Sequence, residues 1–256
     1  MTAEARSGRE APPIAIEVVR ARPPLEPGEA AWRFPPPLGR GTIVVAGGDF
    51  EPATIIEGHR SGYFPWPHGD EEYLWFSPDP RAILPPERFY TSRRLARRIR
   101  QGRFRVTIDA DFPAVIAACA DRPTGTWITP GLAAAYRRLH ELGWAHSIEV
   151  WSLEGVLIGG LYGVAIGGLF VAESKFHRAT DASKIALAAL VQWCRARGIV
   201  LIDVQVLTPH LASLGAMEVP RRAYLDQLRR ALALPVRFLP DWSAAAGAQR
   251  TTITEG

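Results

Sequence analysis

Two polar residues interrupt an apolar segment in the C-terminal third of the chain. Asp203 and Gln205 lie within residues 200–207, whose other members are all valine, leucine or isoleucine. A strand this apolar is normally buried on both faces, and the alternation of a strand puts the two polar side chains on the same face. A buried carboxylate is costly unless it is hydrogen-bonded or paired. The pattern therefore fits either a structural polar pair near a strand end or one wall of a cleft.

A second apolar segment ends in an acid. Residues 169–172 are followed directly by Glu173 and then by a charged and hydroxylated run that leads into a predicted helix. Glu173 either pairs with one of the basic residues that follow it or joins Asp203 and Gln205 at the end of a neighbouring strand. In the second case the acids and the amide would suit the handling of an amine, because an acceptor can take its proton and a negative field holds a cation.

Aromatic residues in loops form the next candidate group. Trp66 lies between two prolines, Trp127 lies in the loop 125–129, and Tyr136 lies on the helix predicted after that loop. Tryptophans in loops either cover the core or, when they are exposed, provide surfaces on which a base or a ribose stacks. Both interpretations stay open at this point.

A run of arginines occupies the predicted helix 92–101, which Ser92 begins as N-cap and Gly102 ends. On a helix Arg93, Arg97 and Arg100 share one face, and Arg94 and Arg98 lie beside it. The run is either a solvated surface or a patch that binds a phosphate backbone. Repulsion between like charges four residues apart disfavours a purely structural role, and a polyanion would relieve it.

The rest of the chain has to position these groups. Residues 1–40 are rich in proline, glycine and charge, which predicts a flexible N-terminal extension. We expect a small N-terminal domain at 41–80, a larger domain at 81–242 and a flexible tail at 243–256. The predicted helices are 52–62, 92–101, 111–120, 129–143, 181–197 and 220–232, and the predicted strands are 42–45, 81–84, 104–108, 146–151, 156–164, 169–172 and 199–206. Helices interleaved with a mixed sheet give the fold class α+β.

The composition excludes several classes of protein. Hydrophobic residues make up 47% and charged residues 22% of the chain, which is ordinary for a soluble protein, and no apolar run is long enough to span a membrane. The two isolated cysteines and the absence of an apolar signal region indicate a cytoplasmic protein. The net charge of +4 permits a nucleic-acid partner. Because no phosphate-binding loop and no His/Cys cluster occur, we expect no cofactor and no metal. A substrate that is already activated would suit such a protein.

At this point the motifs resemble those of the bacterial leucyl/phenylalanyl-tRNA–protein transferase family. The matching segments occur in the family's order and extend over roughly residues 42–228; they are 64–66, 75–81, 125–129, 146–151, 173–174, 182–184, 201–207, 212–216 and 220–222. The resemblance implies a small N-terminal domain followed by a larger mixed-sheet domain with an acetyltransferase-like (GNAT) fold. It implies aminoacyl-tRNA as the donor of leucine or phenylalanine. The acceptor would be a protein or peptide with N-terminal Arg or Lys, marked for degradation by the N-end rule.

The resemblance also assigns roles to residues. Asp203 and Gln205 match the family's catalytic aspartate and glutamine, and Glu173 matches its active-site glutamate. The expected substrate-binding residues are Trp66, Trp127, Tyr136, Ser174, Lys175 and Leu161. The arginine pattern of the helix 92–101, and not the resemblance, gives the expected tRNA-binding residues, which are Arg93, Arg94, Arg97, Arg98 and Arg100. The ester of a charged tRNA is already activated, so the enzyme has to orient an amine that sheds a proton, either through Gln205 polarised by Asp203 or without such help.

Two positions depart from the family pattern. His59 stands where the family usually has a tyrosine, and Lys175 stands where it usually has a methionine that lines an apolar pocket for the donor side chain. A lysine there is unfavourable unless its ammonium group reaches outward. These departures suggest an altered donor or a small-molecule acceptor. Two further alternatives are a tRNA-binding module without catalysis and an acetyltransferase that depends on acyl-CoA.

Overall fold

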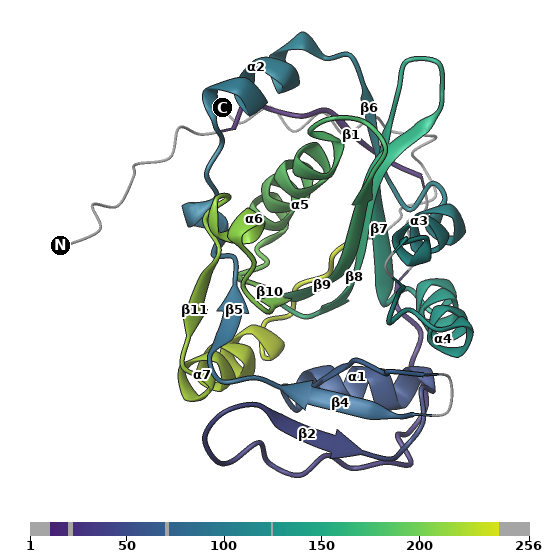
Figure 1. Cartoon of the computed structure of the whole chain (residues 1–256), viewed down its shortest axis with the longest axis vertical. Coiled ribbons are helices and arrows are strands. Elements are labelled where there is room, and N and C mark those ends of the chain that lie inside the picture. The colour runs from purple at the N-terminus through teal and green to yellow at the C-terminus, as the bar shows by residue number, and fades with distance from the viewer. Residues whose placement is uncertain (1–10, 20–22, 70–71, 124, 241–256) are drawn as a thin grey trace, which may run out of the picture.

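A large mixed sheet forms the centre of the computed structural model, which describes residues 11–19, 23–69, 72–123 and 125–240 (Figure 1). Within these residues the sheet has eight strands in the order β1-β6-β7-β8-β9-β10-β5-β11. The pairs β1–β6 and β9–β10 are parallel, and the other neighbours are antiparallel. The strands are β1 (Ile16–Val18), β5 (Arg81–Ile83), β6 (Arg105–Ile108), β7 (Ala145–Trp151), β8 (Leu157–Ile166), β9 (Leu169–His177), β10 (Leu201–Gln205) and β11 (Met217–Val219).

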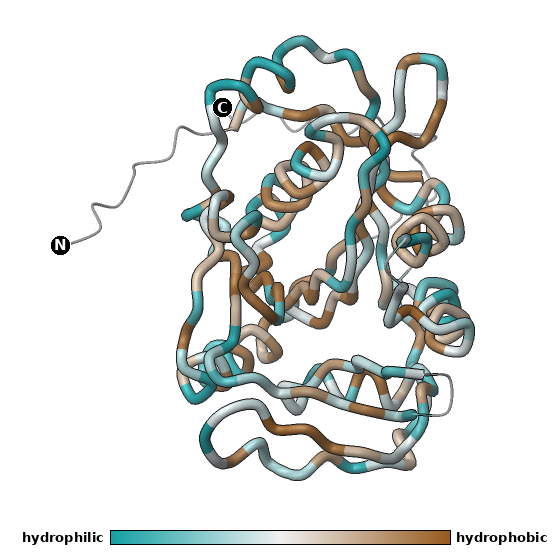
Figure 2. The backbone as a smooth tube through the Cα atoms, in the orientation of Figure 1, coloured by the Kyte–Doolittle hydropathy of each residue, from teal (hydrophilic) through white to brown (hydrophobic). Residues whose placement is uncertain are grey.

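Helices cover both faces of this sheet. Helix α5 (Ala182–Arg197) packs on β7, β8 and β9 on one face, and α3 (Phe112–Ala120) and α4 (Pro130–Glu141) pack on the other. Figure 2 shows that α5 is largely hydrophobic and that α2 (Arg93–Gln101) is largely hydrophilic. The remaining helical segments are the 3-10 turn η1 (Pro86–Arg88), α6 (Pro209–Ala212) and α7 (Arg221–Leu232).

Local signals explain where these helices begin and end. The side chains of Ser92, Asp111 and Thr129 accept hydrogen bonds from backbone N–H groups in the first turns of α2, α3 and α4. Gly102 and Gly198 end α2 and α5 in the left-handed conformation, with φ of 61° and 74°. The helix boundaries predicted from the sequence therefore agree closely with the structure, because capping residues and apolar spacing mark them.

A small N-terminal unit lies against one end of the large sheet (Figure 1). Its antiparallel sheet has the order β2-β4-β3, with β2 (Ile43–Ala46), β3 (Phe64–Pro65) and β4 (Leu74–Ser77), and it carries α1 (Pro52–Arg60). Trp75 is fully buried in this unit, and its ring meets Phe34 and Phe50 edge-on at 4.8 and 5.7 Å. Helix α1 also contacts α4 and α7, which joins the small unit to the large one.

The structure differs from the sequence expectations at two places. The segment 1–40 was expected to be a flexible extension, but β1 lies within it, and Ile14 and Ile16 are buried against the large core. Residues 1–10 of that segment and the expected tail 243–256 lie outside the described residues. In addition, β9 continues to His177, so Glu173 lies inside a strand and not after its end. The α+β class with a large mixed sheet and a small N-terminal region is confirmed, and the exact domain boundaries stay a prediction.

Candidate active site

The parallel strands β9 and β10 bring an acid and an amide together. Their register pairs Asp203 with Val171 and so places Gln205 beside Glu173. The side-chain amide of Gln205 donates from Nε2 to Oε2 of Glu173 at 3.0 Å. The pairing of β10 with β5 shifts between Asp203 and Gln205, and Gln205 has a φ of 63°. This bulge turns Gln205 away from the simple alternation expected from the sequence and aims it at β9.

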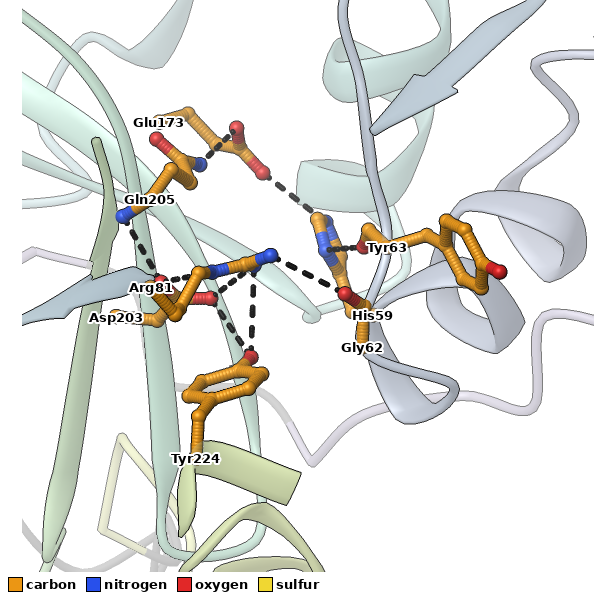
Figure 3. Close-up of polar contacts among 8 residues, drawn as sticks. All are labelled: His59, Gly62, Tyr63, Arg81, Glu173, Asp203, Gln205 and Tyr224. Atoms are coloured by element: carbon orange, nitrogen blue, oxygen red, sulfur yellow. Dashed lines mark hydrogen bonds and ion pairs between the residues drawn. The ribbon is translucent and has the colours of Figure 1, made fainter. Parts of the chain in front are cut away.

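Asp203 lies behind this pair and is completely buried (Figure 3). Its carboxylate accepts from Arg81 twice, from Nε at 2.9 Å and from Nη2 at 2.6 Å. It also accepts from the backbone N–H of Gln205 at 2.9 Å and from the hydroxyl of Tyr224 at 2.8 Å. Both oxygens are therefore occupied, and Asp203 reaches Gln205 through its backbone and not through its side-chain amide. Asp203 fixes the position of Gln205 from behind.

Arg81 keeps its charge although it is buried. Burial alone would lower the pKa of the guanidinium group, but the adjacent Asp203 carboxylate raises that pKa above its ordinary value. The third arm of the group, Nη1, donates to the backbone oxygen of Gly62 in the small N-terminal unit at 3.1 Å. Arg81 therefore connects the carboxylate behind the site to the loop that follows α1.

Glu173 is surrounded by groups from four other elements. Its Oε1 lies 3.0 Å from Nε2 of His59, and the other ring nitrogen of His59 lies 3.2 Å from the backbone oxygen of Tyr63. Burial, and next the negative charge of Glu173, raise the pKa values of Tyr136 and Tyr162 well above the ordinary range. These phenols therefore stay protonated near the carboxylate. Tyr136, which the sequence analysis expects to contact substrate, is fully buried close to Glu173.

A pocket opens in front of Glu173 and Gln205. Its empty volume is about 730 Å³, with open solvent at its mouth included. Five more residues that the sequence analysis selected line this pocket: Trp66, Trp127, Leu161, Ser174 and Lys175. Trp66 is 38% exposed at the rim, so its indole is free to stack on a planar group. Asp203 and Tyr136 are fully buried and are not among the residues that line the pocket.

Lys175 gives one wall of the pocket a positive character. Burial lowers the pKa of its ammonium group, and the positive charge of Arg122 lowers it further. Arg122 donates from Nη2 to Oγ of the adjacent Ser174 at 2.8 Å. Leu187 and Leu211 contribute apolar surface to the same pocket. The pocket is therefore mainly apolar and has cations close to one side.

The arginines of α2 form a separate surface. All five are exposed, whereas Leu95 and Ile99 of the same helix are buried. Arg94 and Arg98 lie 3.2 and 4.0 Å from Asp181 at the start of α5. Figure 1 places α2 at the end of the molecule opposite to the small N-terminal unit. The structure thus gathers these arginines on one helix but does not bring them to the pocket.

Sequence reasoning missed two residues of the site. Arg81 begins a short strand 122 residues before its partner Asp203, so no local pattern connects them. His59 was noted only as an unusual residue, and its contact with Glu173 depends on how α1 docks. An arginine at the start of an apolar strand, matched with an aspartate in another apolar strand, was the available signal for the first pair.

Neither a metal site nor a membrane span is found in the part of the chain that the structure describes. No group of three or more His, Cys, Asp or Glu side chains there is arranged to hold a metal ion. None of the helices there has the length and apolarity to cross a membrane.

Sequence comparisons match most of the chain. A family model described as leucyl/phenylalanyl-tRNA protein transferase matches residues 83–229, and a model of the N-terminal domain of the same family matches residues 48–79. The leucyl/phenylalanyl-tRNA–protein transferase of Ectopseudomonas mendocina (strain ymp) is 49% identical over 224 residues, which cover 84% of this chain and 96% of that protein. The enzyme of the same name from Alkalilimnicola ehrlichii is 46% identical over 222 residues, covering 86% of this chain and 84% of that protein.

A solved structure is also similar, but only remotely. L-PGS from Bacillus licheniformis is 12% identical, with a TM-score of 0.35, over 68% of this chain and 61% of that one. A likeness at this level supports no inference about fold or activity.

Proposed function

Because the chain belongs to the leucyl/phenylalanyl-tRNA–protein transferase family, we propose that it transfers leucine or phenylalanine from a charged tRNA to a protein. The acceptor would begin with Arg or Lys. The observation that carries the proposal is the Gln205–Glu173 hydrogen bond of 3.0 Å on the wall of a mainly apolar pocket. This arrangement offers a site for an amine directly beside a site for an apolar side chain.

Because the aminoacyl ester is already activated, the enzyme mainly has to orient the acceptor amine toward the ester carbonyl. The nitrogen of the acceptor attacks the ester carbonyl of the aminoacyl-tRNA, an N–C bond forms, and the C–O bond to the ribose breaks. Gln205 donates its N–H to Glu173, which leaves its own amide oxygen free to accept a hydrogen bond from the attacking amine. Holding the amine near the carbonyl in this way turns a bimolecular step into an oriented one.

Within this proposal Asp203 is a positioning residue. It holds Gln205 by the backbone N–H at 2.9 Å, and its own charge is matched by Arg81. Of the two proton routes considered from the sequence, polarisation of the Gln205 side chain by Asp203 has no direct contact to support it. Orientation of the reacting groups by Gln205 and Glu173 fits the contacts better. The negative charge of Glu173 would also attract the cationic end of an acceptor.

The lining of the pocket suits an apolar donor side chain, except at Lys175. Leu161, Leu187 and Leu211 would receive a leucine or phenylalanine side chain, and Trp66 and Trp127 would stack on the terminal adenosine of the tRNA. The ammonium group of Lys175 favours a second candidate, an enzyme of the same reaction class with an altered donor or a small-molecule acceptor.

The remaining expectations also stay proposals. The exposed arginines of α2 would bind tRNA phosphates away from the pocket. The large domain would have an acetyltransferase-like fold, and the parallel β9–β10 pair inside a mainly antiparallel sheet is the feature that favours it. The protein would act in the cytoplasm, and its products would enter degradation by the N-end rule.

Peptide labelling tests the function directly. The purified protein is incubated with leucyl-tRNA and peptides that begin with Arg, Lys or Ala, and the products are identified by mass. We expect leucine on the Arg and Lys peptides only. Gln205→Ala should abolish the product while tRNA binding persists, and Gln227→Ala, on α7 and outside the pocket lining, serves as the matched control. Binding of charged tRNA without any peptide product would refute the proposal and favour a non-catalytic tRNA-binding module.

A further inference from the structure

A histidine from the small N-terminal unit reaches the acid of the candidate active site (Figure 3). His59 lies on α1, and Glu173 lies on β9 of the large sheet. Nε2 of His59 and Oε1 of Glu173 are 3.0 Å apart, and both side chains are fully excluded from solvent. A contact this close between two buried titratable groups fixes how many protons they hold.

The second ring nitrogen determines the tautomer of His59. Nδ1 lies 3.2 Å from the backbone oxygen of Tyr63, and a carbonyl oxygen only accepts hydrogen bonds. Nδ1 therefore carries a hydrogen, and in a neutral imidazole Nε2 then has only a lone pair. A lone pair on Nε2 facing a carboxylate oxygen at 3.0 Å would leave two acceptors in contact with no water to separate them. One proton must lie between them.

We propose that His59 and Glu173 hold one proton jointly and that this bond keeps the Glu173 carboxylate in place to hold the side-chain amide of Gln205. The inference rests on the proposed function. Gln205 lines the pocket, whereas the carboxylate of Glu173 is covered and His59 acts through it. His59 is thus a positioning residue.

Other charged and titratable groups around the pair do not replace it. Arg81 is committed to Asp203, and burial raises the pKa values of the nearby phenols, so these groups keep their protons near neutral pH. The phenols are Tyr136 from α4, Tyr162 from β8 and Tyr224 from α7, and Asp203 from β10 pairs with Arg81 from β5.

The first test compares kcat and KM of wild type, His59→Tyr and His59→Phe. Tyrosine donates an O–H to Glu173 and does not titrate near neutral pH, and phenylalanine donates nothing. We expect His59→Tyr to keep kcat within about tenfold of the wild type, because Glu173 still receives a hydrogen bond and still holds Gln205.

The controls separate this role from a structural one. His59→Phe should lower kcat by about 100-fold and leave KM for charged tRNA unchanged, because the group that orients the amine loses its support. Glu57→Gln, on the opposite side of α1, should match the wild-type kcat and KM. Equal kcat values for His59→Tyr and His59→Phe, or a folded His59→Phe variant with wild-type kcat, would overturn the inference.

A second test does not depend on transfer activity. Proton NMR of ¹⁵N-histidine-labelled protein should show a far-downfield exchangeable proton at His59 that disappears in both His59→Phe and Glu173→Gln. Absence of this proton in the wild type overturns the inference even if the enzyme transfers leucine. Its presence in a protein that transfers no amino acid would leave the shared proton in place and refute the proposed function instead.

Discussion

Replacing Asp203 by alanine tests the buried support of the candidate active site. The substitution removes the partner of Arg81, whose guanidinium group is only 1% exposed and has no access to water. It also removes the acceptor of the Gln205 backbone N–H and of the Tyr224 hydroxyl. We therefore expect the variant to lose stability, because Arg81 loses its partner, and to lose activity, because Gln205 loses its anchor.

The size of the stability loss follows from the burial of the Arg81–Asp203 ion pair. Breaking a buried ion pair by removing one partner costs about 3–5 kcal/mol, because the remaining charge stays in a poorly solvated place. For a protein of this size each kcal/mol lowers Tm by about 2–4 °C, so the melting temperature should fall by about 6–20 °C. A loss of this kind is a large fraction of a typical total stability of about 5–15 kcal/mol.

Thermal unfolding followed by circular dichroism measures this effect, and two variants serve as comparisons. Asp226→Ala removes an exposed partner of Arg229, so its Tm should stay close to that of the wild type. The double variant Arg81→Met, Asp203→Leu removes both buried charges and should melt above Asp203→Ala. It should remain as inactive, because Gln205 is still without its anchor. A wild-type Tm for Asp203→Ala, or restored activity in the double variant, would refute the reasoning.

Three further predictions concern other parts of the molecule. Changing Arg94 and Arg98 to alanine should weaken tRNA binding and reduce its salt dependence by about 0.7 log unit per lost phosphate contact; filter binding at several salt concentrations that finds no change would remove α2 from the tRNA surface. Lys175→Met should raise kcat/KM for leucyl-tRNA by about tenfold, because an apolar side chain replaces an ammonium group that is unfavourable in this buried place, as its lowered pKa indicates. Efficient leucine transfer by the wild type would reject an altered donor. Burial raises the pKa of Glu149 from 4.5 to about 7, so its contribution to stability is present below pH 4.5 and is lost as the pH rises to 7. Urea unfolding of Glu149→Gln should lack that decline, and an identical decline in both proteins would contradict it.

The sequence predicted those parts of the site that depend on local pattern. Glu173 and Gln205 stood out because polar residues in apolar strands are costly unless they are paired, and the structure brings them to one hydrogen bond. Trp66 and Trp127 stood out as loop indoles, and both line the pocket. The capping residues and the apolar face of α5 made the helices equally predictable.

The unpredicted features depend on contacts between distant segments. The bulge between Asp203 and Gln205 breaks the alternation on which the expected shared face was based. The Arg81–Asp203 and His59–Glu173 pairs arise only when β5 and α1 dock against the central strands. No single segment carries a signal for either contact.

The short strand β1 has a practical consequence for recombinant work. It covers the edge of β6, and Gln192 holds the backbone of Ile14 with hydrogen bonds of 2.8 and 2.9 Å on its N–H and its oxygen. A truncated clone that starts at residue 41, as the proline-rich composition invites, would uncover that edge and the apolar surface beneath Ile16. Uncovered strand edges pair between molecules, so such a clone should accumulate in inclusion bodies, whereas one that starts near residue 11 should stay in solution.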